Sequence, residues 1–278
     1  MVEIPTTETL RFERDGHVGR LVLNRPDKLN SFTIGMWHEL RAVGAALSED
    51  PDLRALIVSG EGRAFSSGID TSVFTGGGLD DGTTTGDDSG TRHEDPTVDG
   101  LLRVQDSYTW LEEAPFATIA AVHGYALGAG LQLALACDIR VIAKGTKVGL
   151  LELKYGIMPD LGGTQRLPRL VGAGKAKELI FTGARIEAEE AHRIGLCERL
   201  VDEADLQREA GELAALVAAQ PPLAVRGTKR AVAAAATLPV REGLVVEAEL
   251  QAQCLRSHDM REAITAFVEG RQPVYDAR

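Results

Sequence analysis

The sequence predicts an α/β fold followed by a C-terminal region that is almost wholly helical. Through about residue 203, short apolar runs rich in β-branched residues alternate with stretches of helical periodicity. Strands that are apolar on both faces are typical of parallel sheets covered by helices. From residue 204 onward the chain is rich in Ala and lacks strand patterns, so we expect a core at residues 1–203 and a helical region at 204–278.

Turn residues and helix caps place the individual elements. Asp15-Gly16 predicts a β-hairpin, Thr33 is the expected N-cap of the first helix, and Pro115 ends a later one. Residues 76–100 are rich in Gly, Asp and Thr, which predicts a flexible loop. The expected strands are residues 10–12, 17–23, 53–59, 118–122, 139–143, 147–151 and 197–201. The expected helices of the core are residues 34–47, 101–112, 131–137, 164–171, 175–182 and 188–193.

Composition argues against several classes of protein. Lys plus Arg is 30 and Asp plus Glu is 41, and the resulting net charge of −11 argues against nucleic acid and anionic membranes as partners. No apolar run has transmembrane length, and the N-terminal residues lack the pattern of a signal peptide. The distant cysteines Cys137, Cys197 and Cys254 predict reduced, buried thiols of a cytoplasmic protein.

A glycine-dense turn at residues 124–130 is the most informative feature of the chain. It joins an apolar strand to an apolar helix, whose first N–H groups are suited to holding a negative charge. A dinucleotide site would need a third glycine, where Leu133 stands, and an acidic residue after the second strand, where Lys144 stands. An oxyanion hole and a tight junction without a ligand are the two interpretations that remain.

Two carboxyl groups are candidates for acid/base chemistry. Glu152 lies among apolar neighbours, and burial there would raise its pKa toward neutrality. Spacing alone instead favours an exposed Glu152 paired with Lys154. Asp160 lies in a Pro-Asp-Leu-Gly-Gly turn, where Asp commonly bonds to the local backbone. The chain has no H-E-x-x-H, G-x-S-x-G or P-loop motif, and no metal is expected.

Six collinear segments resemble the enoyl-CoA hydratase/isomerase family, often called the crotonase family. They are residues 23–32, 63–70, 120–140, 158–172, 181–196 and 257–275. The resemblance implies a spiral of β-β-α repeats, capped by C-terminal helices that build a trimer or a dimer of trimers. It also implies a fatty or other hydrophobic acyl-CoA substrate. Coenzyme A is then part of the substrate, and no separate cofactor is expected.

The resemblance further implies roles for individual residues. The thioester oxygen would be held by the backbone N–H groups of Ile69 and Ala129. The residues implied in substrate binding are Arg25, Lys28, Ala64, Ser66, Gly68 and Gly128.

Hydratases of this family resemble one another in two glutamates 20 residues apart, and this chain has Gln132 and Glu152 at those positions. An amide cannot act as a general base. The favoured expectation is therefore double-bond isomerisation by Glu152, with Gln132 as an orienting group. Asp160 lies eight residues after Glu152, as in the dienoyl-CoA isomerases that this chain resembles in part, and would be a second acid/base group. Water addition by Glu152, alone or with Asp160, and non-catalytic acyl-CoA binding are the alternatives.

Overall fold

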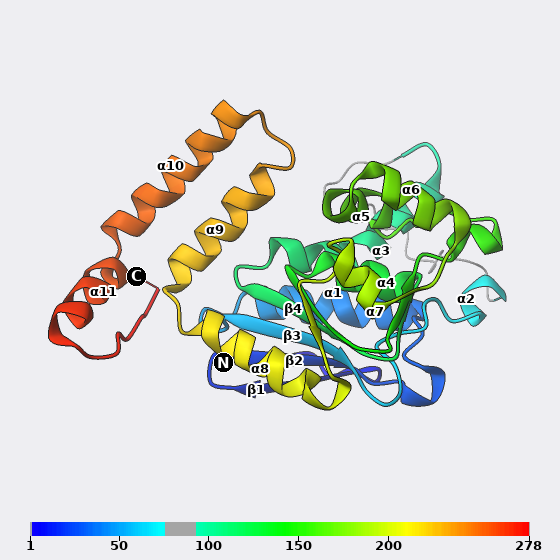
Figure 1. Cartoon of the computed structure of the whole chain (residues 1–278), viewed down its shortest axis with the longest axis horizontal. Coiled ribbons are helices and arrows are strands. Elements are labelled where there is room, and N and C mark those ends of the chain that lie inside the picture. Colours follow the sequence, from blue (N-terminus) through cyan, green and yellow to red (C-terminus); the bar gives the residue numbers. More distant parts are fainter. Residues whose placement is uncertain (1, 76–92, 278) are drawn as a thin grey trace.

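The computed structural model describes residues 2–75 and 93–277, and its centre is a six-stranded sheet of order β1-β2-β3-β4-β6-β9 (Figure 1). The hairpin β1–β2 is antiparallel, and every other neighbouring pair in this sheet is parallel. Its strands are Leu10–Asp15 (β1), Val18–Leu23 (β2), Ala55–Gly60 (β3), Ala117–Val122 (β4), Ile139–Ala143 (β6) and Arg199–Val201 (β9). A smaller sheet has the order β5-β7-β8, with strands Tyr125–Leu127, Lys147–Gly149 and Ile186–Glu187.

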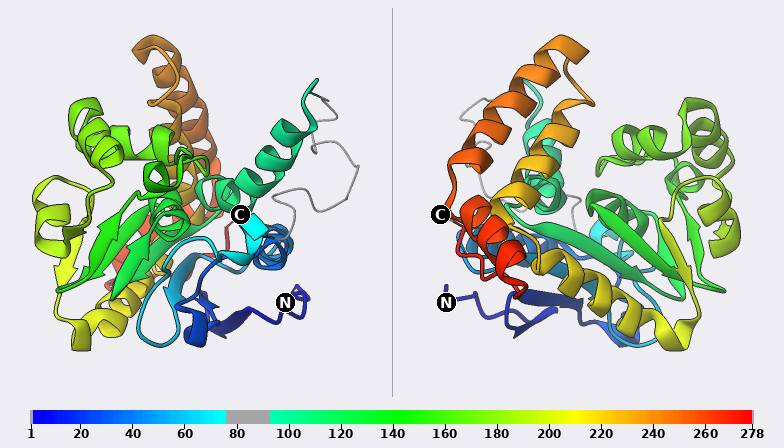
Figure 2. Two further views of the ribbon diagram at one scale, coloured as in Figure 1. Left: turned by 90° about the vertical axis from the view of Figure 1, so that its right-hand side faces the viewer. Right: turned by 60° about the vertical axis from the view of Figure 1, so that its left-hand side comes forward.

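Both faces of the large sheet are buried, as the continuous apolar strands predict. Successive residues of a strand point to opposite faces. Ile57 and Ile119 therefore pack with α8 (Leu206–Ala218), which lies along one face of the sheet (Figure 2). Leu56 and Ala120 instead join the main core, to which α1 (Ile34–Ser48), α3 (Pro96–Glu113) and α4 (Ala129–Ala136) contribute. The α/β architecture predicted from the sequence is confirmed.

Close packing of α1 on α3 depends on Gly44. A Cβ atom at Gly44 would lie 2.4 Å from Cδ2 of Trp110, whereas a Cβ at the exposed Gly35 of the same helix would meet only Thr33 Oγ1, at 3.9 Å. We expect Gly44→Ala to lower the free energy of unfolding by about 1–3 kcal/mol through overpacking. Gly35→Ala is the matched control and is expected to raise it, by up to about 1 kcal/mol. Equal effects of the two variants in urea unfolding would contradict this account of the helix contact.

Several expectations need correction. Helix α3 begins at Pro96, with Asp95 as its N-cap, so the loop expected at 76–100 is wrong for residues 96–100. Residues 76–92 of that loop lie outside the described part of the chain. The strands β5 and β8 escaped sequence reasoning because they have three and two residues, too few to show a period. Of the cysteines, Cys254 is half-buried rather than buried.

The remaining helices follow the predicted order along the chain, except that the short helix Ser72–Thr75 is not predicted from the sequence. In the core they are Ser72–Thr75 (α2), Gly163–Val171 (α5), Ala173–Thr182 (α6) and Ala188–Arg193 (α7). Short 3₁₀ turns lie at Pro26–Lys28, Glu152–Tyr155 and Glu203–Asp205. None of the helices in residues 2–75 and 93–277 has the length and apolar character needed to cross a membrane.

The last three helices form an arm whose first helix contacts β4, while the other two extend away from the sheet (Figure 1). They are Pro222–Ala234 (α9), Val240–Arg256 (α10) and His258–Glu269 (α11). The arm exposes large apolar side chains, among them Leu244, Phe267 and Val268. Contiguous exposed apolar surface is typical of a site that another molecule covers. The predicted boundary at residues 203 and 204 stays a prediction, since α8 packs on the sheet and the arm begins only at α9.

Candidate active site

A cavity of about 500 Å³ opens where the loop after β3 meets the turn between β5 and α4. This volume is typical of small-molecule sites in proteins. Ile69, Ala129 and Glu152 line it, together with Gly68 and Gly128. Three distant segments of the chain therefore contribute to one site, and each contributes a residue that the sequence had singled out.

The two loops that carry Ile69 and Ala129 are held together by backbone hydrogen bonds. The N–H of Ser66 donates to the carbonyl of Tyr125 over 2.9 Å, and the N–H of Leu127 donates to the carbonyl of Ser66 over 3.0 Å. Gly68 has a φ of +108°, and a Cβ atom there would lie 2.9 Å from the Leu127 carbonyl oxygen and 3.8 Å from the Ala129 nitrogen. Glycine thus lets the first loop approach the start of α4.

The N–H groups of Ile69 and Ala129 have no hydrogen-bond partner within residues 2–75 and 93–277. Their neighbours are satisfied, because the N–H of Asp70 donates to Phe32 and that of Gly68 to the Ser66 hydroxyl. Ala129 is the first residue of α4, where helix geometry leaves N–H groups free and the helix dipole is positive. Two free donors at one cavity are suited to an oxygen that gains negative charge.

Glu152 begins the 3₁₀ turn after β7, and its side chain is turned inward. The residue is only 4% exposed, so the exposed pairing with Lys154 that spacing favoured is wrong. Its Oε1 accepts a hydrogen bond from Gln132 Nε2 over 2.8 Å, and a Cβ atom at Gly128 would lie 3.3 Å from the same oxygen. Its Oε2 is buried and has no partner among the described residues. One carboxylate oxygen is therefore occupied and the other is available.

Burial raises the pKa of Glu152 to about 7, against the hydrogen bond from Gln132, which favours the ionised form. The negative charge of Asp160 raises it further. A carboxyl group with a pKa near the working pH can both remove and return a proton.

This raised pKa predicts a pH dependence of stability. Between the ordinary pKa of 4.5 and about 7, the folded protein holds the Glu152 proton and the unfolded chain does not. The contribution of Glu152 to the free energy of unfolding therefore falls as pH rises through this window, by about 3 kcal/mol in total, and is constant above it. Glu152→Gln should remove this slope. Urea unfolding of both proteins from pH 4.5 to 8 measures the difference, and a difference that does not vary with pH would contradict the prediction.

Asp160 lies on the wall of a second cavity that adjoins the first. This cavity has a volume of about 1040 Å³, is lined mainly by apolar side chains, and shares Ile69, Phe74 and Ile157 with the smaller one. The Oδ1 atom of Asp160 is buried without a partner among the described residues, and burial raises the pKa of its carboxyl group. The arrangement places a second buried carboxyl group beside an apolar chamber.

Four of the residues implied in substrate binding lie outside the lining of the cavity. Arg25 donates to the carbonyl of Ser31 and forms an ion pair with Asp70 over 3.1 Å. Lys28 is part of the first 3₁₀ turn. The remaining two, Ala64 and Ser66, are fully buried. Their roles toward a substrate stay predictions, and the contacts seen here stabilise the loops.

Sequence reasoning did not select two arginines at the cavity. Arg63 and Arg185 line it, are exposed, and form no ion pair with the described residues. Arg63 is the first residue of the recognised segment 63–70 and could have been selected on its charge. Arg185 lies after α6 and directly before β8, and the pairing of β7 with β8 brings it to the cavity.

A buried carboxyl group with a raised pKa, beside a cavity with two free backbone donors, is suited to an enzyme that moves a proton next to a developing oxyanion. The chain belongs to the enoyl-CoA hydratase/isomerase family, since the model of that family matches residues 13–278. The predicted family is confirmed.

Individual relatives agree with this assignment. The crystal structure of the enoyl-CoA hydratase from Bacillus anthracis has a TM-score of 0.87 and 33% identity, and the match covers 98% of this chain and 100% of that one. This likeness confirms the crotonase-type spiral. A peroxisomal Δ(3,5)-Δ(2,4)-dienoyl-CoA isomerase from Arabidopsis thaliana is 31% identical over 98% of both chains. A Thermobifida fusca structure assigned as an enoyl-CoA hydratase, in complex with CoA, has a TM-score of 0.80 and 35% identity over 91% of this chain and 97% of that one.

Proposed function

We propose that this protein isomerises a carbon–carbon double bond in an unsaturated acyl-CoA thioester, with Glu152 moving the proton. The observation that carries the proposal is the amide of Gln132 at hydrogen-bond distance from the buried Glu152 carboxyl group. The hydratases that the chain resembles have a second glutamate at that position. An amide neither accepts nor releases a proton at neutral pH. One base between two carbon atoms suffices for isomerisation.

The proton transfer balances without a further reactant. Glu152 Oε2 removes a proton from Cγ of a 2-enoyl thioester, and the electrons of that C–H bond form a new double bond between Cβ and Cγ. The electrons of the former Cα–Cβ double bond form a double bond between Cα and the carbonyl carbon, and the thioester oxygen gains the charge and accepts hydrogen bonds from Ile69 and Ala129. A 3-enoyl thioester instead loses a Cα proton to Glu152, and the same enolate forms directly. Return of the proton at the other carbon completes the isomerisation and restores the Glu152 carboxylate.

The conjugated 2-enoyl thioester thus loses a Cγ proton, and the unconjugated 3-enoyl isomer loses a Cα proton. In both directions the intermediate is one dienolate, with its negative charge on the thioester oxygen. Preorganised backbone donors act on this charge, and a single donor typically contributes about 3–4 kcal/mol to transition-state stabilisation. Glu152 therefore transfers the proton, and the Ile69 and Ala129 N–H groups stabilise the negative charge.

The surroundings of the site support an acyl-CoA substrate. Arg63 and Arg185 offer positive charge at the cavity, suited to phosphate groups of coenzyme A. The adjoining apolar chamber offers room for an acyl chain. The Thermobifida fusca relative was solved with CoA bound. Coenzyme A would arrive as part of the substrate, and we propose no separate cofactor.

Hydration of a 2-enoyl-CoA is the second candidate function. The unpartnered Oδ1 of Asp160 favours it, because Glu152 and Asp160 together could hold and activate a water molecule. The hydratase names of two of the relatives support it as well. In the isomerase proposal, Asp160 would instead serve as the second acid/base group.

The deciding experiment is an incubation in D₂O, followed by NMR, with a 3-enoyl-CoA and separately with a 2-enoyl-CoA. Double-bond movement with deuterium at Cα or Cγ and no hydroxyl product supports isomerisation. Formation of 3-hydroxyacyl-CoA makes the protein a hydratase. Neither product, with CoA binding intact by calorimetry, would instead favour a non-catalytic acyl-CoA binding role.

We also propose that the arm joins copies of this chain into a trimer or a dimer of trimers. The exposed apolar side chains of α10 and α11 support an interface there, because leaving them in water is unfavourable. Light scattering coupled to size exclusion measures the number of copies. Phe267→Glu, at a side chain that is 87% exposed, is expected to reduce the assembly to smaller species.

A further inference from the structure

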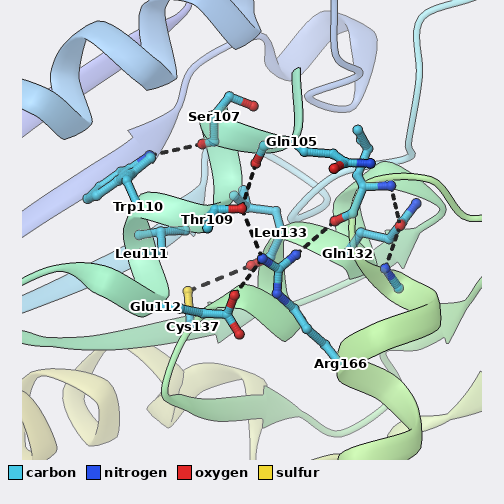
Figure 3. Close-up of polar contacts among 12 residues, drawn as sticks. Gln105, Ser107, Thr109, Trp110, Leu111, Glu112, Gln132, Leu133, Cys137 and Arg166 are labelled. Carbon is cyan, nitrogen blue, oxygen red and sulfur yellow. Dashed lines mark hydrogen bonds and ion pairs between the residues drawn. The ribbon is translucent and has the colours of Figure 1, made fainter. Parts of the chain in front are cut away.

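Gln132 contacts both segments that carry the carboxyl groups of the site. Its side chain is fully buried in α4, and its Oε1 accepts hydrogen bonds from the N–H groups of Leu161 and Gly163, each over 2.8 Å (Figure 3). Its Nε2 donates to Glu152 Oε1, also over 2.8 Å. A Cβ atom at Gly163 would lie 2.8 Å from Gln132 Oε1, so the turn can approach the amide only because glycine stands there.

These contacts assign the orientation of the Gln132 amide. Two N–H donors point at one of its ends, and only the oxygen can accept from both. The NH₂ group must then face Glu152, and it supplies a hydrogen bond to Oε1. Oε2 of Glu152 is left as the oxygen that can exchange a proton with a substrate.

The turn at residues 160–163 is itself held from two further helices. Gln105 of α3 donates to the carbonyl of Asp160 over 2.6 Å, and Arg166 of α5 donates to the carbonyl of Leu161 over 2.8 Å. Arg166 is in turn fixed by Glu112 of α3 over 2.6 Å (Figure 3). The backbone next to the Asp160 carboxyl group is therefore held by two helices, and Gln132 connects it to Glu152.

We infer that Gln132 is a positioning residue whose amide joins Glu152 and the Asp160 turn into one unit and reserves Oε2 of Glu152 for proton transfer. The catalytic consequence rests on the proposed function. The hydrogen bonds that join the Gln132 amide to both segments do not depend on which reaction the protein catalyses.

Two variants separate the two contacts of this amide. Gln132→Glu keeps oxygen atoms that can accept from the Leu161 and Gly163 N–H groups, but its ionised form cannot donate to Glu152. Two carboxyl groups this close cannot both ionise, so the pair retains a proton to higher pH. Gln132→Leu removes the contacts to the turn as well as the contact to Glu152.

For Gln132→Glu we expect the acidic limb of the kcat profile to move up by at least about 1 pH unit. We expect kcat at pH 7 to fall about 10- to 100-fold with KM changed less than threefold, because the available base is scarcer while the binding cavity is retained. Gln132→Leu should lower kcat further and should also move the acidic limb upward. An acidic limb unchanged in both variants would overturn the inference, because a merely structural amide would not move it.

A second readout does not depend on turnover. The pH at which the unfolding stability of the protein stops falling reports the Glu152 proton, and it should move upward in Gln132→Glu. The double variant Gln132→Glu/Glu152→Gln exchanges the amide and the carboxylate, and we expect it to recover the melting temperature lost in Gln132→Glu. An additive loss would overturn the inference. Absence of isomerase activity in the wild type would overturn the proposed function alone.

Discussion

Glu152→Gln is expected to lower kcat by about 10²- to 10⁴-fold, the usual contribution of a positioned acid/base group. The substitution changes one oxygen of a buried side chain that is 4% exposed, so the shape of the cavity should be retained. An amide cannot accept the substrate proton. The affinity for a CoA thioester should change little, because the thioester oxygen meets the Ile69 and Ala129 donors in both proteins.

The measurement is a steady-state comparison with the substrate that the NMR incubation identifies, together with calorimetric titration of a CoA thioester. Glu189→Gln is the matched control, since Glu189 is an exposed carboxylate of α7 outside the cavity lining. We expect that control to retain the wild-type kcat. If Glu152→Gln also retained it, Glu152 would not be the base and the proposed mechanism would be wrong.

Gly68→Ala is expected to lower kcat by about 10²- to 10³-fold, which is the typical effect of losing one oxyanion donor. An alanine Cβ would lie 2.9 Å from the carbonyl oxygen of Leu127, and neither atom can move without its backbone, so one loop must move. Movement of the loop displaces the N–H of Ile69 from the oxygen that it should stabilise. Because the developing charge exists only in the reaction, kcat should fall more than the substrate affinity.

Gly145→Ala separates this contact from the cost of the backbone conformation. Gly145 also has a positive φ, +78°, but a Cβ atom there would meet nothing within 4 Å. Both variants should lose about 1–2 kcal/mol of stability from the left-handed conformation. Only Gly68→Ala should lose activity when both are assayed well below their melting temperatures. Equal activity of the two variants would show that the approach of the loops is not needed for catalysis.

Much of the fold follows from local signals in the sequence. Thr33 begins α1 as expected, and its hydroxyl accepts from the N–H of Met36. Asp15-Gly16 forms the predicted hairpin between β1 and β2. Such elements depend on residues close in the chain, so their patterns are legible without the tertiary structure. Helix α3 was placed too late because the Asp95-Pro96 start signal lies within a polar stretch.

For the site as well, the sequence predicts some properties and only the tertiary structure decides others. The glycines of the turn and the residue types at positions 69, 129, 132 and 152 can be read directly, and the family resemblance assigned them to one site. Local spacing, however, favoured an exposed Glu152 paired with Lys154. The exposure of a side chain depends on what packs over it, and here α4 and the Gly128 turn come from another part of the chain.

The sequence by itself determined the family, the order of the longer strands and helices, and the residues that can donate, accept or ionise. These properties reside in residue types and in contacts between near neighbours. Only the tertiary structure decided that Glu152 is buried, that its Oε1 is occupied by Gln132, and that Arg185 reaches the cavity. A pKa and the direction of an amide depend on burial and on partners, and those come from segments that folding brings together from distant positions in the chain.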